Sequence, residues 1–196
     1  FNDSNPSRQL GGAVALAVAS RVLKDYNKSL AAECLETAEA LWKANKDVKG
    51  PRIDGSKVQL LTELILATDK ESYKKTLCGL KSEAAESFPQ VGWSLGRVLP
   101  HLKCKAFKKA VDNAAQEYQV KLDSVMASTP FRSPLENTEV IGFEHYFLHR
   151  AWPEYYAPDH LFAVVNYLLG CRPGSTTNSL VSGVGVNSPT TAYGTN

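Results

Sequence analysis

Apolar residues recur at every third or fourth position along most of the chain, which is the period of an amphipathic α-helix. The longest series covers residues 107–125 and continues for about five turns. Strand-like alternation is weak everywhere except at 180–186, where glycines argue against a central strand. The pattern therefore predicts an all-α chain of about eight helices. The shorter helical series cover residues 10–21, 30–42, 58–68, 73–84, 91–102, 140–147 and 161–168.

Polar and turn-forming residues mark the expected helix boundaries. Ser56 follows a turn signal and is predicted to be the N-cap of the third helix. Asp69 is predicted to cap the helix after it. A polar stretch with two prolines, residues 128–137, is predicted to end the longest helix. Because most connections are short, neighbouring helices are expected to pair as antiparallel hairpins.

Three of the series are apolar on more than one face. Their sequences read AVALAVASRVL, LLTELILAT and LFAVVNYLL. A helix that buries two sides belongs to the inner part of a layered bundle or ring, because a surface helix needs only one apolar stripe. A toroid of helical hairpins is one architecture that meets this requirement.

Composition and charge limit the functional classes. The chain has 196 residues, of which 43% are hydrophobic and 21% charged, and its net charge is +2. These values are typical of a soluble globular protein, and they give no electrostatic case for binding nucleic acid. No apolar stretch approaches the roughly 20 residues that span a bilayer. Because the chain opens on Phe1, it is expected to be a processed protein or a piece of a longer one.

The four cysteines, Cys34, Cys78, Cys104 and Cys171, form no CxxC pair. This spacing argues against zinc ribbons and thioredoxin-like sites. Cys34 and Cys78 fall on apolar helical faces and are predicted to be buried free thiols. A chain of this size does not require a disulfide.

Other residue types suggest chemistry but have ordinary structural interpretations as well. His145 and His149 share a helical face, yet no glutamate completes an H-E-x-x-H motif, so packed or hydrogen-bonded histidines are predicted rather than a metal site. Trp93 and Trp152 either line a sugar cleft or fill the core. No cofactor is predicted. Asn2-Asp3-Ser4 and Asn27-Lys28-Ser29 match the glycosylation pattern, which also arises by chance.

Three segments together resemble glycoside hydrolase family 9, and the last of them looks closest to its bacterial, Bacteroides-type members. The resemblance covers nearly the whole chain, and the order and spacing of its parts are more specific than any one part. The segments are LGGAVALAVASRVLKDYNKSLAAECLETAEALW, LLTELILATDKESY and HYFLHRAWPEYYAPDHLFAVVNYLLGCRPGSTTNSLVSGVGVNSPTTAYG.

The resemblance implies a toroid of helical hairpins that cuts β-linked glucans with inversion. In the family, an aspartate of a D-A-G-D motif activates water and a glutamate near the C-terminus protonates the leaving oxygen. This chain has neither motif, so residues 1–196 are expected to be the middle part of a catalytic domain and to be inactive alone. The rest of the polypeptide, or a complementary chain, is expected to cover its apolar edge. The family also implies a secreted, periplasmic or cell-surface location.

The loop over residues 171–196 is expected to border the substrate cleft. Asn187, Thr190 and Asn196 are predicted to bind sugar hydroxyl groups. Tyr193 stands near the position of a family histidine, and it either stacks on a sugar ring or anchors the loop.

No catalytic residue is predicted in this chain. Unexpected activity would direct a search to Glu144, Glu154 and Asp159. The alternative to a hydrolase is a noncatalytic helical interaction protein or carbohydrate-binding protein.

Overall fold

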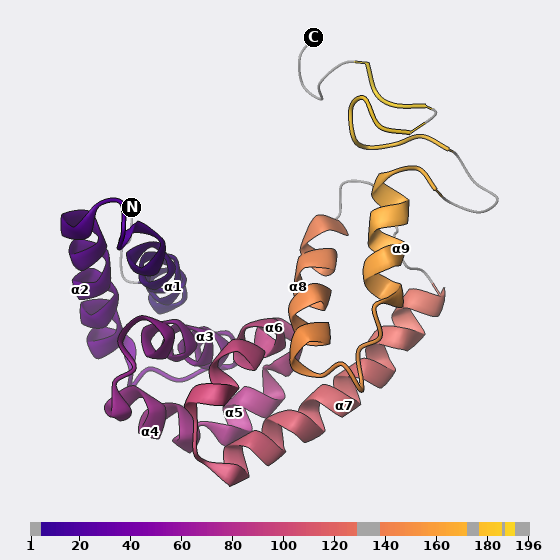
Figure 1. Ribbon diagram of the computed structural model, residues 1–196. Helices are drawn as coiled ribbons and strands as arrows, with labels where there is room; N and C mark the ends of the chain where they lie inside the picture. Colours follow the sequence, from indigo (N-terminus) through magenta and orange to yellow (C-terminus); the bar gives the residue numbers. More distant parts are fainter. Residues whose placement is uncertain (1–4, 129–137, 172–176, 186, 191–196) are drawn as a thin grey trace. The chain divides into compact units, whose positions relative to one another are not determined.

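The computed structural model describes residues 5–128, 138–171, 177–185 and 187–190 (Figure 1). These residues form α-helices with one short 3-10 helix, and they contain no strand beyond an isolated bridge between Asn178 and Asn187. The all-α prediction is confirmed. The helices are α1 Pro6–Leu23, α2 Lys28–Asn45, α3 Pro51–Thr68, α4 Glu71–Gly79, α5 Lys81–Glu86, α6 Phe88–Val98, η1 Leu99–His101, α7 Lys105–Ser128, α8 Thr138–Ala151 and α9 Asp159–Leu168.

The chain divides into two compact units. Unit 1 is Phe1–Tyr118 and unit 2 is Gln119–Asn196, so the boundary lies within the long helix α7. None of the helices in the described segments is both long and apolar enough to span a membrane.

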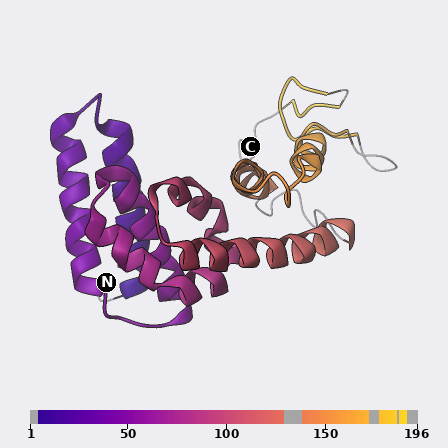
Figure 2. The same ribbon diagram turned by 60° about the horizontal axis from the view of Figure 1, so that its bottom comes forward.

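Helix α3 is the centre of unit 1. It contacts α1, α2, α4, α5 and α6, and Figures 1 and 2 both show these helices gathered around it. Leu61, Thr62 and Glu63 follow one another around the helix at about 100° per residue, and each is at most 1% exposed. The prediction that LLTELILAT buries more than one face is therefore confirmed for α3.

Helices α1 and α2 form a hairpin that packs against α3. Both begin at an asparagine N-cap. The Asn5 side chain accepts from the backbone N–H groups of Ser7 and Arg8, and the Asn27 side chain accepts from that of Leu30. These caps satisfy donors that the first turn of a helix leaves without partners.

Glu63 of α3 is a buried charge in unit 1. Its side chain is 1% exposed and pairs with the guanidinium groups of Arg21 in α1 and Arg97 in α6. The guanidinium of Arg97 also lies over the ring of Trp93, 5.3 Å from its centroid. One carboxylate thus joins three helices that pack together.

The structure corrects the prediction for Cys78. Cys78, at the end of α4, forms a disulfide with Cys104, which precedes α7, whereas Cys34 is a buried free thiol as predicted. Cys171 is free and exposed. The helical pattern placed Cys78 on an apolar face but carried no information about the segment packed beside it.

Two predicted caps are also wrong. Helix α3 begins at Pro51, five residues before Ser56, and the Ser56 hydroxyl donates instead to the carbonyl of Arg52. Asp69 adopts a left-handed conformation, with φ of 54°, and ends α3 rather than starting α4. Its carboxylate lies 2.9 Å from Lys74 Nζ, and hydrogen bonds from Lys74 and His101 lower the pKa of Asp69.

Unit 2 contains a hairpin of α8 and α9. The two helices approach closely at Gly142, where a Cβ atom would lie 2.8 Å from Val164 Cγ1. His145 donates from Nε2 to the Ala157 carbonyl (3.1 Å), and His149 donates from Nδ1 to the Tyr156 carbonyl (2.6 Å). The histidines therefore hold the connection between the helices, which confirms their prediction as hydrogen-bonded structural residues.

The second apolar face predicted for LFAVVNYLL is not buried in the described structure. Phe162 of α9 is 60% exposed and Val165 is 40% exposed, while Val164 and Tyr167 are buried. Helix α8 exposes Val140 and Phe143 in addition. The hairpin of unit 2 thus carries apolar side chains that its own packing does not use.

Candidate functional site

The loop that follows α9 begins at a glycine-dependent helix end. Gly170 has a φ of +75°, its N–H donates to the Tyr167 carbonyl, and the N–H of Cys171 donates to the Asn166 carbonyl. This pair of bonds is the Schellman arrangement, which usually needs glycine at the left-handed position. Helix α9 itself ends at Leu168, so Gly170 is the left-handed residue just beyond its end.

The loop then folds back across the end of α9. Ser179 is buried, and its backbone N–H donates to the Asn187 carbonyl while its hydroxyl accepts from the N–H of Val181. The N–H of Leu180 donates to the Leu168 carbonyl at 2.7 Å. Gly185 passes so close that a Cβ atom there would lie 2.9 Å from the Leu169 carbonyl oxygen. Backbone contacts thus order the loop around Ser179.

The candidate sugar-binding residues have different places in this loop. The Asn187 side chain is exposed but donates to Thr177 Oγ1 at 2.6 Å, so it holds two parts of the loop together. Thr190 is exposed. Tyr193 and Asn196 lie outside the described residues. One amide donor of Asn187 is therefore already used, and the roles of all four residues toward a sugar stay predictions.

Gly170→Ala is expected to destabilise unit 2 by about 1–3 kcal/mol. A left-handed alanine costs energy by itself, and the new Cβ would lie 2.6 Å from the Thr177 carbonyl oxygen. Hydrogen exchange of the Leu180 amide reports the change, because that amide is bonded across the fold of the loop.

Gly183→Ala is the matched control. Gly183 has almost the same φ, +74°, but a Cβ there meets no atom within 4 Å. Gly183→Ala therefore carries only the conformational cost of a left-handed alanine. Equal losses of stability in the two variants would contradict the close packing of Gly170.

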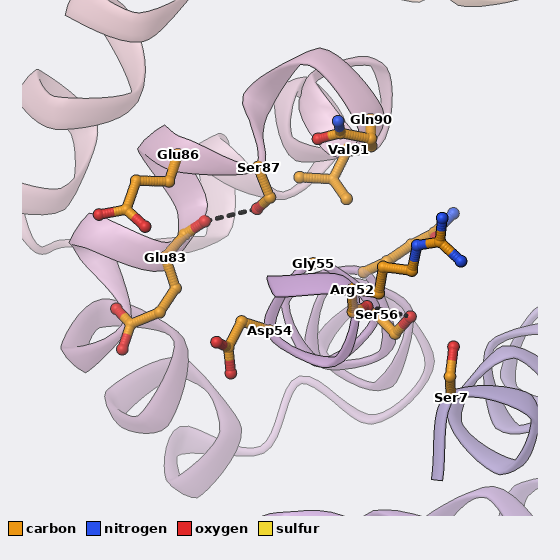
Figure 3. Close-up of a pocket in the computed structure, with 11 residues that line it drawn as sticks. Ser7, Arg52, Asp54, Gly55, Ser56, Glu83, Glu86, Ser87, Gln90 and Val91 are labelled. Atoms are coloured by element: carbon orange, nitrogen blue, oxygen red, sulfur yellow. Dashed lines mark hydrogen bonds between the residues drawn. The ribbon is translucent and has the colours of Figure 1, made fainter. Parts of the chain in front are cut away.

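A pocket of about 520 Å³ lies in unit 1, among the beginnings of three helices (Figure 3). The first turns of α1, α3 and α6 contribute side chains to it, and α5 contributes two glutamates. The helix starts meet here because Gly55 of α3 lets α6 approach; a Cβ at Gly55 would lie 3.3 Å from Ser87 Cβ. The lining residues are Ser7, Arg52, Asp54, Gly55, Ser56, Gln59, Glu83, Glu86, Ser87, Gln90 and Val91.

Most residues that line the pocket have polar side chains, and more of these are acidic than basic. Asp54, Glu83 and Glu86 supply three carboxylates against the single guanidinium of Arg52. Figure 3 shows the carboxylates toward one side of the pocket, with Arg52 and Gln90 toward the other. Amides, hydroxyls and carboxylates together offer both hydrogen-bond donors and acceptors. Such a lining fits a ligand with many hydroxyl groups, since each hydroxyl donates and accepts.

The sequence pattern does not predict this pocket, although local signals mark its parts. Pro6 and Pro51 stand at the first positions of α1 and α3, and Pro89 follows the first residue of α6. Proline is favoured there because the first N–H groups of a helix need no internal partner. A polar residue directly after such a proline, such as Ser7 or Gln90, was the signal in the sequence that could have indicated the pocket. Only the packing of the helices shows that they meet.

The three residues considered for unexpected catalysis, Glu144, Glu154 and Asp159, all lie in unit 2. Glu144 is half-buried on α8, where burial raises the pKa of its carboxyl group. Glu154 and Asp159 are exposed. Burial lowers the pKa of His145, while its hydrogen bond to the Ala157 carbonyl acts in the opposite direction. Within the described ranges, no group of three His, Cys, Asp or Glu side chains is arranged to hold a metal ion.

Comparison of the chain with protein-family models finds no match, and comparison with curated proteins finds no similar sequence.

Proposed function

We propose that the chain is part of the catalytic domain of a glycoside hydrolase that cuts β-linked glucan, or a related polysaccharide, with inversion. The residue pattern that resembles glycoside hydrolase family 9 supports the proposal. The observation in the structure that supports it most is the pocket of unit 1, with its many polar side chains. Its volume of about 520 Å³ falls within the range of roughly 300–1,000 Å³ typical of ligand sites.

In this proposal the hairpins are part of an α/α toroid, and the loop after α9 borders its substrate cleft. The pocket of unit 1 is proposed to bind sugar hydroxyl groups. The apolar side chains exposed on α8 and α9, such as Phe143 and Phe162, support completion by further helices. Those helices belong to the rest of the polypeptide or to a complementary chain. The two carboxyl groups that inversion requires come with them.

The proposed location is secreted, periplasmic or at the cell surface. The disulfide between Cys78 and Cys104 supports it, because disulfides persist in oxidising compartments and are rare in the reducing cytosol.

Cello-oligosaccharides are expected to bind the 196-residue chain without releasing reducing sugar. Gln90→Leu removes hydrogen bonds worth about 1 kcal/mol and is expected to weaken binding about five- to tenfold in calorimetry. Gln116→Leu is the control, because Gln116 is exposed on α7 and does not line the pocket. Equal loss of affinity in both variants would show that the pocket does not bind the oligosaccharide. Reducing sugar released by the pure chain would contradict its expected inactivity.

A noncatalytic carbohydrate-binding or helical interaction protein is the second candidate function. The lack of a D-A-G-D motif and of the family's acid glutamate in this sequence favours it. The source polypeptide distinguishes the two candidates: glucan binding without any turnover by that polypeptide supports the noncatalytic function.

A further inference from the structure

The turn between α1 and α2 presents the tripeptide Asn27-Lys28-Ser29 to solvent. Asn27, Lys28 and Ser29 are all exposed, and the preceding Tyr26 is 87% exposed. The tripeptide matches the Asn-x-Ser/Thr acceptor pattern for asparagine-linked glycans. Nothing in the described part of unit 1 covers this turn.

The hydrogen bonding of Asn27 leaves its amide nitrogen available. Its Oδ1 accepts from the backbone N–H of Leu30 at 3.1 Å and caps α2. Among the described residues, no group accepts a hydrogen bond from Asn27 Nδ2. A substituent on Nδ2 keeps the carbonyl oxygen as an acceptor, so glycosylation and capping are compatible.

We propose that Asn27 is a site of asparagine-linked glycosylation. The donor is an oligosaccharide carried on a lipid pyrophosphate. Nδ2 attacks the anomeric carbon, the bond from that carbon to the pyrophosphate oxygen breaks, and Nδ2 loses one proton as the carbon–nitrogen bond forms. The lipid pyrophosphate leaves with the bonding electrons, so no oxidant or reductant takes part. The proposal rests on the secreted location proposed above, which the Cys78–Cys104 disulfide supports.

Asn5 provides an internal control in the same protein. Asn5 is exposed, caps α1 with its side chain and has a serine two residues later, as Asn27 does. The residue between them is Pro6, which the acceptor pattern excludes. Two asparagines in similar structural settings thus differ mainly in the middle residue of the tripeptide.

The glycan would lie beside exposed apolar side chains of the hairpin. Val22 is 61% exposed and Leu30 is 43% exposed, and both flank Tyr26 and Asn27 in the sequence. The first sugar can rest its apolar face on the ring of Tyr26. A bulky, solubilising group at Asn27 would therefore shield apolar surface at this end of unit 1.

The test is to send the full chain, with an added C-terminal acceptor tripeptide, through a eukaryotic secretory pathway. Peptide mass spectrometry after enzymatic deglycosylation in heavy-oxygen water then measures occupancy at each asparagine. We expect a glycan at Asn27 in most molecules and none at Asn5. Ser29→Ala should abolish the Asn27 signal, and Pro6→Lys should create one at Asn5.

An unmodified Asn27 in molecules whose added tripeptide carries a glycan would overturn the proposal, because those molecules have met the transferase. The readout needs neither glucan binding nor hydrolysis. Failure of the glycosylation site is therefore distinguishable from failure of the proposed enzymatic function.

Discussion

Replacing both Cys78 and Cys104 with serine is expected to lower the free energy of unfolding by about 3–4 kcal/mol. The disulfide joins residues 26 positions apart, and closing a loop of that length removes conformational freedom from the unfolded chain. Urea unfolding followed by tryptophan fluorescence measures the change, since Trp42 and Trp93 both lie in unit 1. The double variant should unfold at a lower urea concentration with its far-ultraviolet circular dichroism otherwise unchanged.

Cys171→Ser is the control for this experiment. Cys171 is an exposed free thiol in unit 2, so its replacement should change stability by less than about 0.5 kcal/mol. Under reducing conditions, the double serine variant and the parent protein should have the same free energy of unfolding. A double serine variant as stable as the oxidised parent would show that the cross-link does not constrain unit 1.

The helices of this chain were predictable because their signal is local and repeated. Each turn of α7 carries its own apolar positions, so the whole helix follows from one period. The boundaries were less predictable where packing overrides a local signal. Asp54-Gly55 has the composition of a turn, yet it lies inside α3, because Gly55 makes room for Ser87 at the start of α6. A helix contact of this kind cannot be read from one segment.

The candidate site shows the same division between local and tertiary information. Gly170 was predictable as a helix end, since glycine at the left-handed position is a local requirement. Asn187 was predicted from its polarity to bind a sugar hydroxyl, and this stays a prediction. The structure adds a contact that polarity alone does not predict, the hydrogen bond from its amide to Thr177 within the loop. The pocket of unit 1 combines residues from four helices. The sequence shows that most of them are polar, but it does not show that they come together in one site.

Glu63→Ala is expected to lower the free energy of unfolding by about 3 kcal/mol, the lower end of the range for breaking a buried ion pair. The substitution leaves the guanidinium groups of Arg21 and Arg97 side by side without the carboxylate between them. The cost stays at the lower end because these side chains are 31% and 25% exposed and keep some water. Urea unfolding measures the change.

Glu71→Ala provides the comparison with a surface pair. Glu71 is 72% exposed and pairs with Lys74 three residues later, so its loss should cost less than about 0.5 kcal/mol. A similarly small loss of stability in Glu63→Ala would mean that water solvates the two guanidinium groups as well as the carboxylate does.

The Arg21→Ala substitution separates repulsion between the two guanidinium groups from simple loss of packing. If the charges of Arg21 and Arg97 repel once Glu63 is gone, removing Arg21 as well should restore part of the stability. A double-mutant cycle between Glu63→Ala and Arg21→Ala should then give a coupling free energy of about 1–3 kcal/mol. Strictly additive effects would show instead that α1, α3 and α6 are held together by their apolar contacts, with Glu63 contributing only its own packing.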